Sequence, residues 1–114
     1  MSAEQDKWLI TVAEAAARIP APPAGQYVEM LRHGTALVEL YAPRGTDPQK
    51  PHTRDELYVV WRGSGTFFRG GERKTFGPGD VIFVPAHMEH RFEDFSDDFA
   101  TWVIFWGPED GEKS

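Results

Sequence analysis

Two histidines and one glutamate stand at the edges of short apolar segments, where together they could hold a metal ion. His52 and Glu56 open a segment that stops at Gly63, and His90 follows residues 81–84 and a loop that contains proline. Two imidazoles and one carboxylate with open coordination positions are the ligand set of non-heme iron, and manganese, nickel, cobalt and zinc also accept it. The alternative interpretation makes His52 and Glu56 ordinary polar residues at a loop–strand junction.

The spacing of these residues limits how they can meet. Four residues of extended chain span about 13 Å, at about 3.3 Å per residue, so His52 and Glu56 cannot share an ion from one straight strand. We therefore expect His52 on a bent approach, after Pro51, and Glu56 at the start of the strand. His90 begins a separate strand, which closure of a barrel would bring close.

Asp55 is a competing carboxylate next to Glu56. Successive side chains on a strand point to opposite faces, so Asp55 should face away from the site. The sequence favours a surface role, in which Asp55 pairs with Arg54 or Arg62.

Two further side chains deserve a place among the site candidates. Tyr58 lies two residues after Glu56 and should point into the barrel, as Val60 and Phe92 should, so its hydroxyl could bind a ligand or act as an acid. The alternative for Tyr58 is core packing with a satisfied hydroxyl. His87 is either an extra metal ligand or an exposed loop histidine.

Composition excludes several classes of function. The chain has 114 residues, 40% of them hydrophobic and 13% aromatic, which suits one folded domain. A net charge of −6 argues against nucleic acid as a partner. The absence of cysteine excludes disulfides, zinc–thiolate sites and thiol catalysis. The first residues do not form a signal peptide and no apolar stretch could span a bilayer, so we expect a cytoplasmic protein without membrane partners.

The elements that must position these residues are mostly short strands. A capping-box pattern predicts one helix over residues 11–18, after a short strand or lead-in at 8–10 and before a proline-rich turn at 22–25. From Tyr27 onward, frequent turn signals separate eight or nine strands, which indicates an all-β barrel or jelly roll.

Three of these strands are apolar on both faces, namely residues 57–61, 81–84 and 102–106. One face can line the barrel, and the other needs a cover. The pattern favours a homodimer that buries outward-facing aromatic residues, with Trp61 and either Trp102 or Trp106 as the main candidates.

Two motifs give the chain a resemblance to a known family. The first consists of His52, three residues, Glu56, six residues and Gly63. The second consists of Gly79, five residues, Pro85, one residue, His87 in place of a glycine, two residues, His90, three residues and Asp94 in place of an asparagine. With both motifs, the chain resembles a small single-domain cupin of the conserved-barrel type over about residues 45–106.

The resemblance implies a cupin-type β-barrel, also called a double-stranded β-helix, with a short N-terminal helix. It implies residues 1–26 as a lead-in, 27–106 as the barrel and 107–114 as a flexible tail. It also implies His52, Glu56 and His90 as ligands of one divalent ion. Lys50 departs from the motif because it replaces the first histidine, and an ammonium group cannot ligate a metal. A Lys50 that pointed inward would repel a cation or meet an anionic substrate.

Three functions follow from these observations. The first is a metal-dependent enzyme, of the oxygenase or isomerase type, acting on a small organic substrate. The second is a non-catalytic module that binds or senses a small molecule, with or without metal. The third, a metal-free epimerase of sugar nucleotides, is ranked last because it needs a histidine–aspartate base pair and such enzymes are usually longer.

Overall fold

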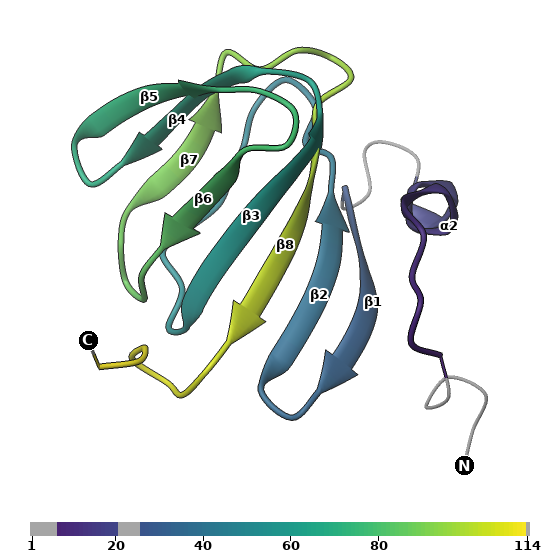
Figure 1. Cartoon of the computed structure of the whole chain (residues 1–114). Coiled ribbons are helices and arrows are strands. Elements are labelled where there is room, and N and C mark those ends of the chain that lie inside the picture. Colours follow the sequence, from purple (N-terminus) through teal and green to yellow (C-terminus); the bar gives the residue numbers. More distant parts are fainter. Residues whose placement is uncertain (1–6, 21–25, 114) are drawn as a thin grey trace.

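The computed structural model describes residues 7–20 and 26–113, and it is built mainly from strands (Figure 1). This confirms the all-β fold with a short N-terminal helix that the sequence predicts. The strands are β1 (Tyr27–His33), β2 (Ala36–Tyr41), β3 (Asp55–Arg62), β4 (Gly65–Arg69), β5 (Glu72–Phe76), β6 (Val81–Val84), β7 (His90–Glu93) and β8 (Ala100–Trp106).

The strands form two antiparallel sheets. The larger sheet has the order β1-β2-β8-β3-β6, and the smaller has the order β5-β4-β7. Within the larger sheet β3 pairs with β8 on one side and with β6 on the other, so β3 is a central strand. It follows the loop of residues 42–54, which contains three prolines. In the smaller sheet β7 pairs with β4. Figure 1 shows the smaller sheet beside the β6 end of the larger one.

The helix α2 (Val12–Arg18) begins at the predicted capping box. The Thr11 hydroxyl accepts the Glu14 N–H, and the Glu14 carboxylate accepts the Thr11 N–H. The helix packs Ala15 against the outer face of the larger sheet, in a cluster that includes Val28, Leu40, Trp61 and Trp102. The helix thus supplies a cover for two of the outward-facing tryptophans.

Of the two alternatives predicted for residues 8–10, a short strand or a lead-in, the structure has the lead-in. Residues 8–10 form no strand, and the side chain of Trp8 is 89% exposed. An apolar segment becomes a strand only where a neighbouring strand pairs with it, and this segment lies beside none in the described chain. The proline-rich turn predicted at 22–25 lies outside the described residues. In the described part of the chain, no helix is both long and apolar enough to cross a membrane.

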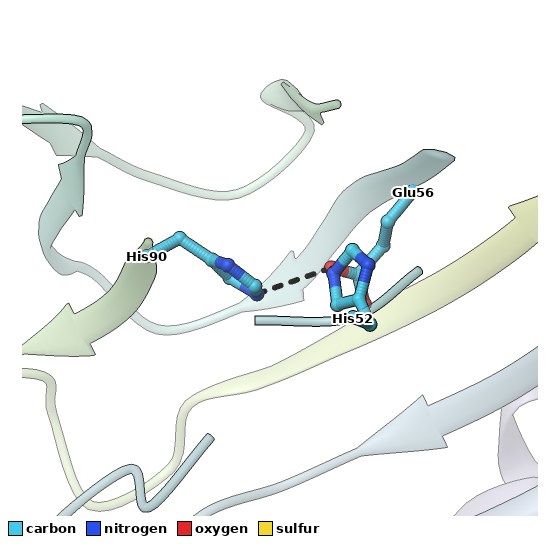
Figure 2. Close-up of side chains that lie close together, drawn as sticks. All are labelled: His52, Glu56 and His90. Carbon is cyan, nitrogen blue, oxygen red and sulfur yellow. Dashed lines mark hydrogen bonds and ion pairs between the residues drawn. The ribbon is translucent and has the colours of Figure 1, made fainter. Parts of the chain in front are cut away.

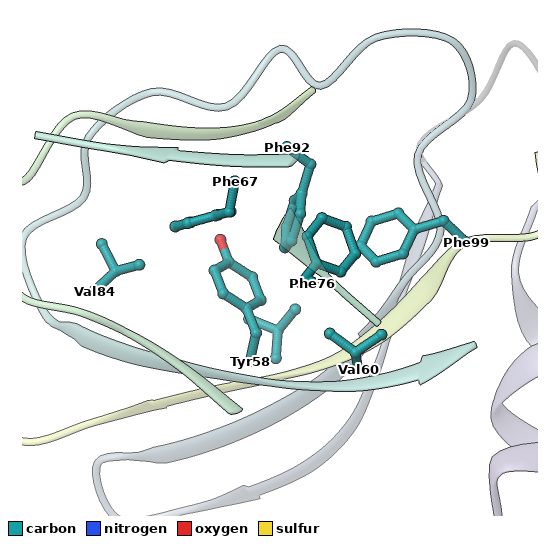
Figure 3. Close-up of a cluster of buried hydrophobic side chains, with 8 residues drawn as sticks. Tyr58, Val60, Phe67, Phe76, Val84, Phe92 and Phe99 are labelled. Atoms are coloured by element: carbon teal, nitrogen blue, oxygen red, sulfur yellow. The ribbon is translucent and has the colours of Figure 1, made fainter. Parts of the chain in front are cut away.

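Between the two sheets lies an aromatic core, drawn in Figure 3. The Phe92 ring is central to it, with centroid distances of 4.8 Å to Tyr58, 4.8 Å to Phe67, 5.4 Å to Phe76 and 4.7 Å to Phe99. Tyr58, Val60 and Phe92 all point into this core, as counting by two along their strands predicts. The core therefore fixes β3 and β7, the strands that carry Glu56 and His90.

Candidate metal centre

His52, Glu56 and His90 meet at one end of the barrel, where one ligand atom from each lies within 4.8 Å of the others. His52 stands in the loop before β3, Glu56 on β3 and His90 at the first position of β7. Nε2 of His52 lies 2.7 Å from Oε1 of Glu56, and Nε2 of His90 lies 3.3 Å from the same oxygen (Figure 2). Two segments that are distant in the sequence, residues 52–56 and the start of β7, thus meet at one carboxylate.

Backbone carbonyls orient both imidazole rings. Nδ1 of His52 lies 2.7 Å from the carbonyl oxygen of Arg54, and Nδ1 of His90 lies 2.8 Å from that of Met88. A carbonyl oxygen only accepts hydrogen bonds, so each Nδ1 carries a proton and each neutral ring keeps its lone pair on Nε2. Metal-binding histidines are usually held in this way by a second hydrogen bond.

Two buried atoms at this cluster lack hydrogen-bond partners among the described residues. They are Oε2 of Glu56 and Nε2 of His90, whose 3.3 Å approach to Glu56 lacks hydrogen-bond geometry. An unsatisfied buried polar group costs about 1–3 kcal/mol. The lone pair of a neutral His52 also faces a carboxylate oxygen at 2.7 Å, which is favourable only with a proton or a cation between them. The donor set therefore fits a bound cation.

The electrostatics of the cluster separate the pKa values of its two most buried members. Burial raises the pKa of Glu56, but the close imidazoles of His52 and His90 outweigh burial and leave this pKa below its ordinary value. Burial lowers the pKa of His90, but Glu56 and the Met88 carbonyl outweigh burial and leave that pKa above its ordinary value. Without metal, the site thus stabilises the ionised form of Glu56 and the protonated form of His90 relative to the same groups in water.

These shifts predict how the stability of the metal-free protein depends on pH. The raised pKa of His90 contributes stability below its unfolded value of 6.5, and this is lost as pH rises through the folded pKa. The lowered pKa of Glu56 contributes stability above its unfolded value of 4.5, and this is lost as pH falls through the folded pKa. We expect the thermal midpoint in chelator to be highest between pH 4.5 and 6.5.

The control for this experiment is His90→Gln, which removes the titrating imidazole. As pH rises above 6.5, the thermal midpoint of this variant should fall much less than that of the wild-type protein. Equal alkaline losses in the two proteins would mean that His90 does not carry the effect.

A second polar network supports the cluster, and the sequence analysis missed it. The buried carboxylate of Asp47 accepts hydrogen bonds from the Tyr41 hydroxyl at 2.5 Å, the Gln49 amide at 2.8 Å and the Phe92 N–H at 2.8 Å. The Gln49 carbonyl accepts the Tyr58 hydroxyl at 3.0 Å. These bonds connect the loop of His52 with β3 and β7, so the network positions all three ligand-bearing segments.

Tyr58 itself is fully buried and points toward this network. Burial and the nearby Glu56 carboxylate raise the pKa of Tyr58 well above its ordinary value. The hydroxyl therefore stays protonated at neutral pH and acts as a hydrogen-bond donor. Asp47 and Gln49 lie in a loop with three prolines, residues 43–51, and their only signal in the sequence is this place just before Lys50.

The structure does not bring Lys50 and His87 into the cluster. The side chain of Lys50 is exposed, and so is that of His87, whose Nε2 lies 2.8 Å from the Asp110 carboxylate. The side-chain amide of Gln49, rather than the neighbouring ammonium, is the group that reaches Tyr58 in the barrel.

For Asp55, the predicted surface ion pair was wrong. Its carboxylate is buried and accepts the Ala86 N–H at 3.0 Å and the Glu112 N–H at 2.8 Å. The C-terminal segment folds back over the start of β3, where Asp110 also donates its N–H to the Thr53 carbonyl. The sequence predicts this segment as a flexible tail, and its flexibility stays a prediction beside these specific contacts.

Two motif positions have unusual backbone angles. His87 and Asp94 replace the glycine and asparagine of the second motif, and both have positive φ, at 68° and 49°. This left-handed region costs about 1–2 kcal/mol for a residue that carries a Cβ, and it favours glycine and asparagine. The glycine and asparagine positions of the motif therefore reflect the positive φ that the backbone adopts there, whereas the histidine position reflects the metal ligation that the resemblance implies.

We expect His87→Gly to be about 1 kcal/mol more stable than His87→Ala, since glycine relieves the left-handed strain at this exposed position. Both variants lose the contact with Asp110, so their difference isolates the backbone effect. Chemical denaturation measures it. Equal stability of the two variants would show that this turn carries no strain.

Comparison with known proteins finds a family and several relatives. A family model described as "Cupin domain" matches residues 37–106. An uncharacterised protein of Streptomyces coelicolor is 39% identical over 87 residues, which cover 75% of this chain and 83% of that protein. The transcriptional activator RhaS of Yersinia pestis is 35% identical over 72 residues, which cover 63% of this chain but only 26% of the regulator.

Solved structures agree on the fold. A cupin-2 domain protein from Shewanella frigidimarina superposes with a TM-score of 0.71 at 14% identity, over 87% of this chain and 95% of that one. At this level of identity the likeness establishes the architecture alone.

Proposed function

The chain belongs to the cupin family, and from this premise we propose that it binds one divalent metal ion and acts as a metal-dependent enzyme on a small organic molecule. His52, Glu56 and His90 are the proposed ligands. Iron, manganese, nickel, zinc and cobalt all suit two imidazoles and one carboxylate. A cytoplasmic location stays a prediction from the sequence.

One observation carries the proposal. Two imidazoles, each already fixed through Nδ1, direct Nε2 at a single buried carboxylate, and two buried polar atoms there have no partner among the described residues. If these residues served only for packing, Oε2 of Glu56 and Nε2 of His90 should have hydrogen-bond partners, because unsatisfied buried groups are rare in folded proteins. A divalent cation is the simplest group that satisfies a carboxylate and two imidazole nitrogens together.

The surrounding residues suit substrate chemistry as well as metal binding. A bound ion would supply a Lewis acid with coordination positions left for water or substrate. The Tyr58 hydroxyl stays protonated near Glu56 and donates to the Gln49 carbonyl, so a substrate would compete with Gln49 for this donor. His52 is the most accessible ligand, with 19% of its side chain exposed, so it borders the route to solvent.

Elemental analysis tests the metal proposal most directly. The protein should be purified without a histidine tag or chelator after growth with iron, manganese, nickel, cobalt and zinc. We expect about one equivalent of a single metal per chain. Metal-free protein that also takes up none of these ions in titration would refute the proposal.

The second candidate is a non-catalytic module that senses or binds a small molecule. It is favoured by the departure at Lys50, which leaves three ligands instead of four, and by the match to a quarter of a transcriptional activator. Turnover of a compound that binds in the barrel separates the two candidates, since a sensor releases its ligand unchanged.

The homodimer predicted from the sequence remains part of this proposal, with a changed contact surface. Trp61 and Trp102 pack beneath α2, whereas Trp106 lies 6.2 Å from the half-exposed Phe83 on β6, as measured between ring centroids. We therefore expect Phe83 and Trp106 to contribute to the dimer contact.

Sedimentation at micromolar concentration should give a dimeric mass, and Phe83→Glu should give a monomeric one. Tyr27→Glu is the matched control, because Tyr27 is an exposed aromatic residue on the distant strand β1. A monomeric wild-type protein would end the dimer proposal.

A further inference from the structure

A second feature of the barrel lies where the two sheets separate. The strands β5 and β6 follow each other in sequence but stand at the edges of different sheets. A cavity of about 460 Å³ opens between them, which is within the usual range for sites that hold small organic molecules. Phe67, Phe76 and Ile82 give it an apolar wall that continues into the barrel core.

The register of the smaller sheet places two cations on the cavity side. Directly opposed residues of an antiparallel pair share one face, and Lys74 is opposite Phe67, which is part of the core. Arg69 is opposite His90, whose ring points inward. Arg69 and Lys74 therefore both belong to the inner face of the sheet, and both line the cavity.

These two cations are not neutralised within the described chain. No ion pair joins either of them to a carboxylate among the described residues, and Arg69 donates only to the Phe83 carbonyl, at 2.8 Å. Of the two acidic residues that line the cavity, Asp80 accepts the Gly77 N–H, and Glu72 is opposite Arg69 on the same face but is exposed and forms no ion pair with it. Arg69 uses one guanidinium nitrogen for the Phe83 carbonyl, so its other N–H groups are available to bind an anion.

The outer face of the same sheet shows a different arrangement. There Arg73 and Arg91 stack on the Phe68 ring, and both bind the Glu93 carboxylate. The two arginines of the outer face are therefore paired with a carboxylate, whereas Arg69 and Lys74 on the inner face form no such ion pair among the described residues.

The cavity shares one residue pair with the strand of a candidate metal ligand. As opposed residues, Arg69 and His90 have Cβ atoms about 4.5–5.5 Å apart. Arg69 therefore links the cavity to the strand that carries His90, although none of the three proposed ligands lines the cavity. The apolar wall of Phe67, Phe76 and Ile82 extends from there toward the β5–β6 turn.

We propose that this cavity binds a small organic carboxylate, whose anionic group pairs with Arg69 and Lys74 and whose apolar body contacts Phe67, Phe76 and Ile82. As a statement about substrate class, this rests on the proposed function, because only the Arg69–His90 pair connects the cavity with the candidate metal centre. As a statement about binding, it requires no metal.

Titration of benzoate into metal-free protein, followed by calorimetry and by amide chemical shifts, tests the inference. Benzyl alcohol is the uncharged probe of similar shape. We expect saturable benzoate binding, with shifts on β4, β5 and β6, and binding of benzyl alcohol that is at least tenfold weaker. Arg69→Gln and Lys74→Gln should each weaken benzoate binding about ten- to hundredfold, as expected for a lost charged hydrogen bond.

Arg73→Gln is the matched control, since Arg73 lies next to Lys74 but on the outer face. It should bind benzoate as the wild type does. Because Arg69 also bridges to Phe83, Lys74→Gln serves as the second variant whose exposed side chain is not needed for folding. The absence of saturable binding, equal binding of the two probes, or equal weakening by Arg73→Gln would overturn the inference.

Metal titration of the same proteins separates this inference from the proposed function. Metal uptake without benzoate binding would refute only the carboxylate site. Benzoate binding that Arg69→Gln weakens, in a protein that takes up no metal, would support the carboxylate site and refute the metal proposal.

Discussion

Replacing His90 with alanine should leave the protein without stoichiometric metal. His90 is completely buried, its Nδ1 is fixed on the Met88 carbonyl, and its Nε2 approaches Glu56 to 3.3 Å. Loss of an outer partner alone typically weakens metal binding 10–100-fold, so loss of a ligand should weaken it by at least about a hundredfold. Metal content after dialysis and the dissociation constant from titration both measure this effect.

The control is His87→Ala, which removes an exposed imidazole three residues away. This variant should retain one equivalent of metal. If His87→Ala loses the metal while His90→Ala keeps it, the ligand set is misassigned, and the loop of His87 must approach the site in solution.

Phe92→Ala should cost about 3–5 kcal/mol of unfolding free energy, which is a large part of the 5–15 kcal/mol typical of a domain. The Phe92 ring contacts four other aromatic rings of the core, and the surrounding strands cannot collapse fully into the space that it leaves. Chemical denaturation measures the change.

Tyr27→Ala provides the comparison, since this exposed aromatic residue on an edge strand should cost about 1 kcal/mol or less. A cost for Phe92→Ala as small as that for Tyr27→Ala would mean that the core tolerates the cavity. The stability of the fold would then not depend on this aromatic cluster.

The sequence predicted the strands well because their signals are local. The apolar segments 57–61, 81–84 and 102–106 mark β3, β6 and β8 to within two residues, and the capping box marks α2. Residues 8–10 show the limit of such signals. Their apolar composition suits a strand, but a strand also needs a partner in space, which composition does not encode.

Asp55 and Gln49 show why the site was only partly predictable. Asp55 was correctly placed on the face opposite Glu56, but its burial depends on residues 107–113, which fold back from 50 positions or more away in the sequence. The motif drew attention to Lys50, whereas the loop directs Gln49 toward Tyr58. The residue spacing within the two motifs identified His52, Glu56 and His90. The hydrogen bonds of Asp47 and Gln49 depend on the conformation of their loop, which the spacing does not encode.

The division of the triad between the two sheets affects the dynamics of the barrel. Glu56 belongs to the larger sheet and His90 to the smaller one, and no backbone ladder joins β3 to β7. A metal bound between them would act as a cross-link that fastens the two sheets at their open end. Removal of the metal should let the three-stranded sheet separate from the larger sheet more often. Amide hydrogens of β4 and β7 should then exchange faster with solvent, while those of β2 and β8 stay protected.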